Sequence, residues 1–180
     1  MKTITVPTRG QVSPASQAIF DFYQKRMGKV PNLYATLGYS EYALKAFFDL
    51  DETLSKGVFT PKEREAVALI VSEINGCAYC LAGHTVAAMR RGFTKEDTLD
   101  IRRGQVNDPK LRSIIQVASA MVENKGHVEE GILGAFYEAG WNEAALMELA
   151  GLVSLRVFTN YAFALTAIPI DFPIVDTINA

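Results

Sequence analysis

Apolar positions along the chain recur three and four residues apart, and the segments that carry them begin with helix-capping residues. The clearest case opens at Thr60-Pro61 with Glu63, which is typical of an N-cap, a proline at the first helical position and a capping-box acid. The apolar residues that follow make one broad face: Val67, Leu69, Ile70, Val71 and Ile74. No stretch alternates apolar and polar residues in the sustained way of a half-buried strand. The pattern therefore predicts an all-α protein.

The same capping residues give approximate helix bounds. Ser40, Thr94, Asp108 and Asn142 are placed as N-caps, and several glycines as C-terminal stops. The expected helices run over about 41–56, 61–74, 77–91, 95–104, 109–125, 128–140 and 143–166. We expect a helical bundle of roughly eight helices in a single domain over residues 1–180, with an irregular N-terminal arm (1–15) and a C-terminal tail (168–180).

A faint internal repeat has an offset of 48 residues. The segment "KEREAVALIVSE" (62–73) aligns with "KLRSIIQVASAM" (110–121), and "RRGFTKEDTLDI" (90–101) aligns with "EAGWNEAALMEL" (138–149). Amphipathic helices resemble one another by chance, so a duplication is a hypothesis only. If it is real, only the first copy carries the cysteines and histidine described below.

Composition and charge argue against some classes of function. The chain has 49% hydrophobic and 21% charged residues, which is ordinary for a water-soluble globular protein. Its formal charge of −2 gives no reason to expect nucleic acid or an anionic membrane as a partner. The N-terminal residues lack the apolar run of a signal peptide. The tract "VFTNYAFALTAIPI" is expected to be too short and too polar to span a bilayer. We therefore expect a cytoplasmic protein.

The chain has two cysteines and two histidines, and three of these four fall within eight residues as Cys77, Cys80 and His84. On a helix, with about 100° per residue, all three share one face. Two thiols three residues apart can approach closely enough for a disulfide. Asn75-Gly76 places Cys77 in the first helical turn, where free N–H groups favour a thiolate. His84 is placed to take or relay the proton of Cys80.

Glu65 is the candidate partner of His84. It lies ten residues before Asn75, and His84 lies nine residues after it. If the two helices fold back antiparallel, Glu65 and His84 each lie about 14–15 Å from the turn along the helix axis, so they stand opposite each other. A carboxylate on one imidazole nitrogen fixes the tautomer and raises the basicity of the ring. The alternative is a solvated acid near a helix start.

The motif Glu65-x11-Cys77-x2-Cys80-x3-His84 resembles that of the alkylhydroperoxidase D-like proteins within the carboxymuconolactone decarboxylase family. The flanks "PNLYATLGYS", "TPKEREAVALIVSEINGCAYCLAGHT" and "IDFP" resemble its peroxidase-related branch. The resemblance implies an all-helical fold, homo-oligomers, and reduction of hydroperoxides without a metal or organic cofactor, at the expense of an external dithiol. It implies that Cys80 is the peroxidatic cysteine, that Cys77 is the resolving one, and that Glu65 and His84 form a proton relay.

One residue departs from the best-studied branch, which has a further histidine where this chain has Tyr79. A phenol can donate a hydrogen bond but is a poor base near neutral pH, so the relay is expected to be shorter or weaker. The decarboxylase branch lacks the cysteine pair, so the pair argues against lactone decarboxylation.

Three alternatives remain for the cysteine cluster. Cys77, Cys80 and His84 could bind zinc, although the sequence indicates no fourth ligand. The thiols could be inert core residues. They could also belong to a general disulfide oxidoreductase, or to an assembly protein that only senses oxidation. Tyr34 and Tyr39 are candidates for the border of a substrate pocket.

Overall fold

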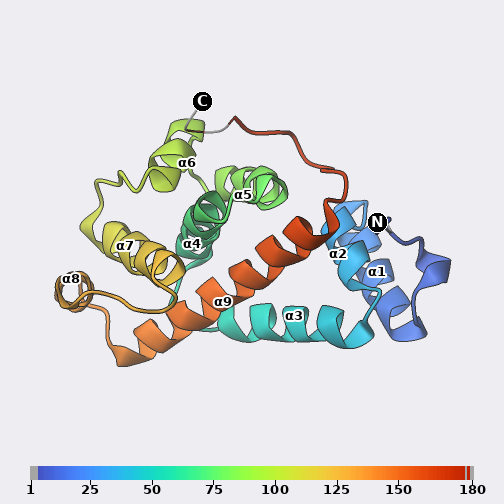
Figure 1. Ribbon diagram of the computed structural model, residues 1–180, viewed down its shortest axis with the longest axis horizontal. Coiled ribbons are helices and arrows are strands. Elements are labelled where there is room, and N and C mark those ends of the chain that lie inside the picture. The colour runs from blue at the N-terminus through green and yellow to red at the C-terminus, as the bar shows by residue number, and fades with distance from the viewer. Residues whose placement is uncertain (1–3, 177, 179–180) are drawn as a thin grey trace.

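The computed structural model describes residues 4–176 and 178, and over these residues it contains helices and no strand (Figure 1). The all-α class predicted from the sequence is confirmed. Nine α-helices and one short 3-10 helix are present in this part of the chain: η1 (Arg9–Gln11), α1 (Pro14–Met27), α2 (Asn32–Leu37), α3 (Glu41–Leu54), α4 (Pro61–Ile74), α5 (Ala78–Arg90), α6 (Lys95–Arg102), α7 (Pro109–Glu123), α8 (Glu130–Glu138) and α9 (Glu143–Thr166).

The capping residues named from the sequence begin the helices assigned to them. Side chains of Ser40, Thr60, Thr94, Asp108 and Asn142 each accept a hydrogen bond from a backbone N–H in the first turn. Each bond satisfies one of the donors that a helix start leaves free. These local interactions explain why the helix starts could be located from sequence alone.

The N-terminal region and two helix starts differ from the prediction. Helix α1 begins at Pro14, inside the arm predicted for 1–15, and α1 and α2 raise the number of helices from about eight to nine in the described chain. Helix α5 begins one residue later than expected, so Cys77 is its N-cap. Helix α8 begins at Glu130 rather than near 128. The predicted tail, 168–180, is irregular from Ile168 to Asp176; residues 1–3, 177, 179 and 180 lie outside the described residues.

The boundaries that suggested a repeat are present in the structure. Pro61 and Pro109 both open helices. Gly92 and Gly140, also 48 residues apart, both have left-handed backbones with φ of 93° and 92°, a conformation that glycine adopts without the steric cost of a side chain. Helix starts and glycine stops therefore recur 48 residues apart in the structure, while the duplication itself stays a hypothesis.

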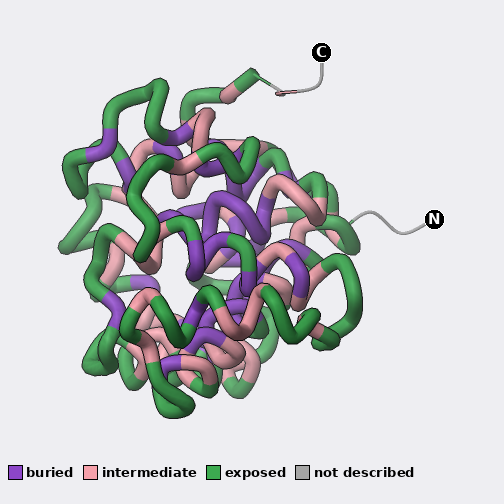
Figure 2. The backbone as a smooth tube through the Cα atoms, turned by 90° about the vertical axis from the view of Figure 1, so that its left-hand side faces the viewer, coloured by how far each residue is buried: buried purple, intermediate pink, exposed green. Residues whose placement is uncertain are grey.

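Helix α4 lies at the centre of the bundle and packs against α5, α6, α7 and α9. Its residues 66–72 are buried without interruption, and Figure 2 shows the buried backbone concentrated in the interior. A helix whose surface is apolar or small nearly all round is stable only where other helices cover it. Glu65 therefore projects from a helix that four other helices cover.

Helix α9 crosses the whole bundle in Figure 1 and packs against α2, α3, α4, α5 and α7. Its 24 residues, with a mean hydropathy of 1.3 over the most apolar window, meet the length and composition of a membrane span. The shorter tract named from the sequence, residues 157–170, covers only the C-terminal part of this helix and the residues that follow it. Within the helix, however, Arg156 is buried and paired with Asp51 of α3, which is the packing of a core helix in a water-soluble protein.

Candidate functional site

Helices α4 and α5 form an antiparallel pair joined by a tight turn at Asn75-Gly76. Gly76 has a left-handed backbone with φ of 62°, which a side chain would strain. The amide of Asn75 donates to Asn160 of α9, and the amide of Asn160 donates to Ser72. The turn is thus fixed to α9, and it sets where α5 and its two cysteines begin.

The four residues predicted for the site divide into two contacting pairs. Cys77 and Cys80 form a disulfide, with their Cα atoms 5.3 Å apart. Glu65 Oε2 lies 2.8 Å from Nδ1 of His84. The disulfide geometry and the Glu65–His84 pairing inferred from helix spacing are both present. No hydrogen bond joins His84 to either sulfur among the contacts of the described residues, so the last link of the expected relay is absent in this oxidised form.

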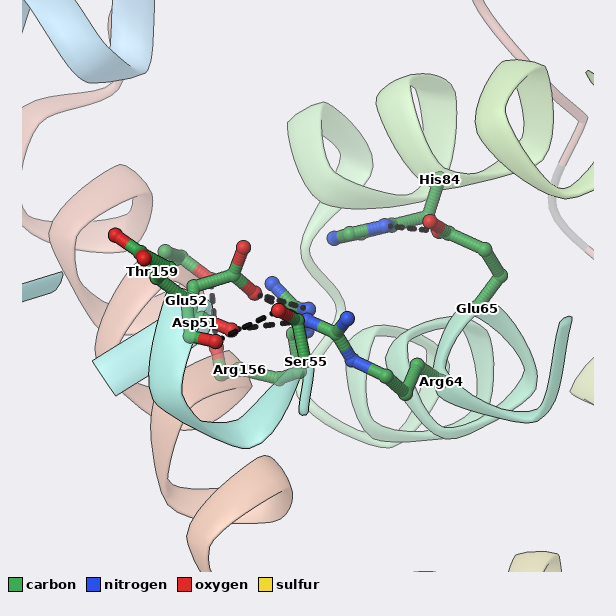
Figure 3. Close-up of polar contacts among 8 residues, drawn as sticks. All are labelled: Asp51, Glu52, Ser55, Arg64, Glu65, His84, Arg156 and Thr159. Atoms are coloured by element: carbon green, nitrogen blue, oxygen red, sulfur yellow. Dashed lines mark hydrogen bonds and ion pairs between the residues drawn. The ribbon is translucent and has the colours of Figure 1, made fainter. Parts of the chain in front are cut away.

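The electrostatics of the pair define the histidine tautomer. Burial alone would raise the pKa of Glu65, but the hydrogen bond with His84 and the nearby charges of His84, Arg156 and Arg91 together lower it. An ionised carboxylate only accepts hydrogen bonds, so Nδ1 carries the proton. Nε2 of a neutral ring is then free to accept a proton. Figure 3 shows this nitrogen directed away from Glu65.

The two cysteines differ in their surroundings. Both are buried, with 2% of Cys77 and 4% of Cys80 exposed. The sulfur of Cys77 accepts the N–H of Cys80 at 3.3 Å, in the position of a helix N-cap. Cys80, unlike Cys77, lines a cavity of about 560 Å³ that also contains Glu65 and His84. A small molecule in this cavity therefore meets Cys80, while the helix N-terminus favours negative charge on Cys77.

Tyr79 does not take the place of a relay histidine. Its hydroxyl donates to Asp171 Oδ1 at 2.6 Å and accepts the N–H of Leu33 at 3.1 Å. Burial, together with the hydrogen bond to Asp171, raises the pKa of Tyr79 far above its usual range. The phenol is therefore a structural donor that holds the C-terminal tail on α5.

Sequence reasoning missed the charged groups of the cavity. Arg64 and Arg156 both donate to Asp51 Oδ1, at 2.9 and 3.1 Å (Figure 3). Arg156 is one of only two charged residues after the first turn of an otherwise apolar helix, and that isolation was the available sign of a buried role. Tyr34 lines the cavity as expected, whereas Tyr39 does not; its hydroxyl donates to the backbone of Thr5.

No group of three or more His, Cys, Asp or Glu side chains is arranged to hold a metal ion within residues 4–176 and 178. Cys77 and Cys80 are bonded to each other, and the free edge of His84 faces the cavity. The zinc alternative therefore gains no support from the geometry.

Residues 41–107 match the Carboxymuconolactone decarboxylase family. This segment contains all four residues of the motif. The resemblance to this family that the motif indicated is confirmed over residues 41–107. No curated protein matches the chain significantly.

Solved structures of similar fold cover nearly the whole chain. A peroxidase-related protein from Silicibacter sp. TM1040 is 24% identical, with a TM-score of 0.78 over 94% of each chain. An alkylhydroperoxidase AhpD core protein from Ralstonia eutropha JMP134 is 20% identical, with a TM-score of 0.81 over 96% of this chain and 92% of that one. The debrominase Bmp8 is 20% identical, with a TM-score of 0.79 over 95% and 93%. These likenesses establish the alkylhydroperoxidase D-like helical fold.

Proposed function

We propose that this protein is a thiol-dependent peroxidase that reduces small organic hydroperoxides through the Cys77–Cys80 pair. The observation that carries the proposal is the position of Cys80 in a cavity that also contains the paired Glu65 and His84. A nucleophile, a base and a carboxylate that orients the base are the parts that thiol activation needs. Similarity of fold to peroxidase-related proteins agrees with this chemistry.

The catalytic cycle balances with one hydroperoxide and one external dithiol. Nε2 of His84 takes the proton of Cys80, and the thiolate attacks the terminal peroxide oxygen. The O–O bond breaks, the proton returns to the leaving alkoxide, and Cys80 becomes a sulfenic acid. Cys77 then attacks the sulfur of Cys80, which releases water and forms the disulfide. An external dithiol reduces the disulfide and restores both thiols.

The surroundings of Cys77 suit the resolving and leaving-group role. When a reductant attacks Cys80, the sulfur of Cys77 must leave as a thiolate. The N–H of Cys80 and the N-terminus of α5 stabilise negative charge there. This asymmetry supports the assignment of Cys80 as the attacked and attacking sulfur.

Burial of both sulfurs favours this function over a general disulfide oxidoreductase. A protein disulfide cannot reach two cysteines that are only 2% and 4% exposed unless the covering segments move, whereas a small hydroperoxide fits a cavity of about 560 Å³. Protein substrates would therefore react slowly compared with small oxidants.

The test is peroxide consumption with small dithiols, in the native protein and in two single variants. The native protein should turn over. Cys77→Ser should consume about one equivalent and hold a sulfenic acid on Cys80 that dimedone labels, and Cys80→Ser should consume none. Labelling of Cys77 in Cys80→Ser, with none in Cys77→Ser, would reverse the two roles. A native protein whose thiols peroxide leaves reduced would overturn the proposal.

A further inference from the structure

The cavity beside Cys80 has a charge opposite to that of the protein. Five arginines line it (Arg26, Arg64, Arg90, Arg91 and Arg156) against the carboxylates of Asp51 and Glu65, a formal excess of three positive charges. The whole chain carries a formal charge of −2. Hydroperoxide chemistry at a cysteine does not by itself need this excess, so it requires another explanation.

Two of these arginines, Arg156, which is buried, and Arg64, which is partly buried, are incompletely paired. The side chains of Arg64 and Arg156 are only 13% and 8% exposed. Both donate to the same oxygen of Asp51, and the Nε atom of each is buried without a hydrogen-bond partner. Buried donors are nearly always satisfied in native proteins, and an unsatisfied one is costly. No hydrogen bond among the described residues occupies the terminal Nη1 group of either arginine, and these groups are not enclosed, so both guanidinium groups keep donors for an acceptor in the cavity.

The remaining lining is aromatic. Tyr23, Tyr34 and Phe47 lie at the same cavity, with the rings of Tyr23 and Tyr34 5.2 Å apart. Burial raises the pKa of Tyr23 to about 12 and also raises that of Tyr34, so both phenols stay uncharged at neutral pH. An aromatic wall beside incompletely paired guanidinium groups fits a molecule that has both an apolar body and an anionic end.

We propose that the cavity binds organic acids, with the ligand carboxylate accepting from the terminal Nη1 groups of Arg64 and Arg156 and its apolar body against the aromatic wall. A planar carboxylate matches guanidinium donors, and such charged hydrogen bonds are the strong ones. Figure 3 shows both guanidinium groups between Asp51 and the His84 ring. The carboxylate would therefore lie on the side of the cavity toward which the free nitrogen of His84 points.

Within the proposed peroxidase function, on which this step rests, the substrate is a hydroperoxide that carries a carboxylate. The cavity is far larger than hydrogen peroxide requires. Anchoring one end of a substrate orients its other end, and that orientation lowers the barrier of the reaction at Cys80. The cavity therefore selects hydroperoxides that carry a carboxylate at one end of an apolar body, such as those of aromatic carboxylic acids.

Binding to the oxidised protein tests the carboxylate site without any turnover. Calorimetry with 4-isopropylbenzoate and its uncharged amide separates the charge from the shape of the ligand. The acid should bind about 10- to 100-fold more tightly than the amide, as expected for charged hydrogen bonds. In Arg156→Met and Arg64→Met this preference should fall about tenfold or more. Arg112→Met, at an arginine outside the cavity, is the matched control and should keep it.

Folding is checked by thermal unfolding, and Arg156→Lys, which keeps the charge but loses the planar guanidinium fork, should give an intermediate preference. Equal binding of acid and amide would overturn the inference, as would formate binding as tightly as the aryl acid. A preference unchanged in both Arg64→Met and Arg156→Met would also overturn it.

Kinetics then link the site to the reaction. The ratio of kcat/KM for para-carboxylated cumene hydroperoxide to that for cumene hydroperoxide should exceed about ten in the native protein and fall toward one in Arg156→Met. Selective binding without turnover of either hydroperoxide would refute the peroxidase proposal and leave the acid site intact. Turnover of both hydroperoxides without selective binding would refute the acid site alone.

Discussion

The C-terminal tail packs over the Cys77–Cys80 disulfide, and release of the tail is expected to limit reduction of this disulfide by a protein dithiol. In Figure 1 the tail leaves the end of α9 and runs past α5 toward α6. Ile168, 2% exposed, packs in one cluster with Cys77 and Cys80. Asp171 accepts from Tyr79 and is paired with Lys29 at 2.8 Å. A protein partner can touch the sulfurs only after these contacts open.

The perturbation is Asp171→Asn, which keeps the size of the side chain and removes its charge. The hydrogen bond from Tyr79 to a carboxylate contributes about 1.5–3 kcal/mol, and the neutral bond left to an amide about 1 kcal/mol. The pair with Lys29, whose side chain is 42% exposed, adds less than about 1 kcal/mol after solvent screening. The variant should therefore ease opening of the tail by about 1–2 kcal/mol, a 5- to 30-fold increase in the open fraction.

The assay measures the rate at which thioredoxin and dithiothreitol reduce the Cys77–Cys80 disulfide, by acid quench and maleimide labelling. If opening is fast relative to exchange, the rate with thioredoxin follows the open fraction and rises by the same 5- to 30-fold. Dithiothreitol reaches Cys80 through the cavity, so its rate should change less. Asp176→Asn, in the same tail, is the matched control, because it is the backbone carbonyl of Asp176 that accepts from Arg102.

Two results would refute this reasoning. One is a thioredoxin rate that Asp171→Asn leaves unchanged. The other is an equal acceleration for both reductants, or in both variants, which would indicate general loosening of the fold rather than release of the tail. Urea unfolding of the same variants separates that case, because general loosening lowers the free energy of unfolding.

Three further predictions follow from the site and from α9. Glu65→Gln and His84→Gln should each slow peroxide-driven thiol oxidation about 10²-fold, and the double variant little more; independent, multiplicative effects would dismiss the relay. Because the pKa of Glu65 lies below its ordinary 4.5, its stabilising contribution is present above pH 4.5 and is lost as the pH falls through the lowered pKa. The free energy of unfolding should thus decline less between about pH 5.5 and 3 in Glu65→Gln than in the native protein, and parallel declines would contradict this. We also expect a homo-oligomer built partly on α9, because Leu165 near the end of this helix is 83% exposed. Light scattering should give a native mass well above the 19.8 kDa of one chain, and a mass of 19.8 kDa would refute the expectation. Leu165→Glu should lower the native mass, whereas the control Tyr42→Glu, at a residue 80% exposed on α3, should not.

The sequence by itself determined the class of fold, most helix starts and the pairs within the site. Caps such as Thr60 and Asn142 act within one helical turn, so their effect can be recognised without knowledge of tertiary contacts. The positions of Glu65 and His84 along their helices follow from counting residues on either side of one turn. In the structure Glu65 Oε2 lies 2.8 Å from Nδ1 of His84. Local geometry was sufficient for each of these inferences.

Only the tertiary structure decided what surrounds the disulfide. Arg64 and Arg156 lie 92 residues apart in the chain, and they meet at Asp51 because α3, α4 and α9 pack together. Asp171 reaches Tyr79 across a similar separation, through the path of the tail over α5. Such contacts depend on how helices stack and on which buried charges remain unpaired, and no local pattern of residues encodes either property. The cluster of incompletely paired arginines at the cavity therefore became visible only in the folded protein.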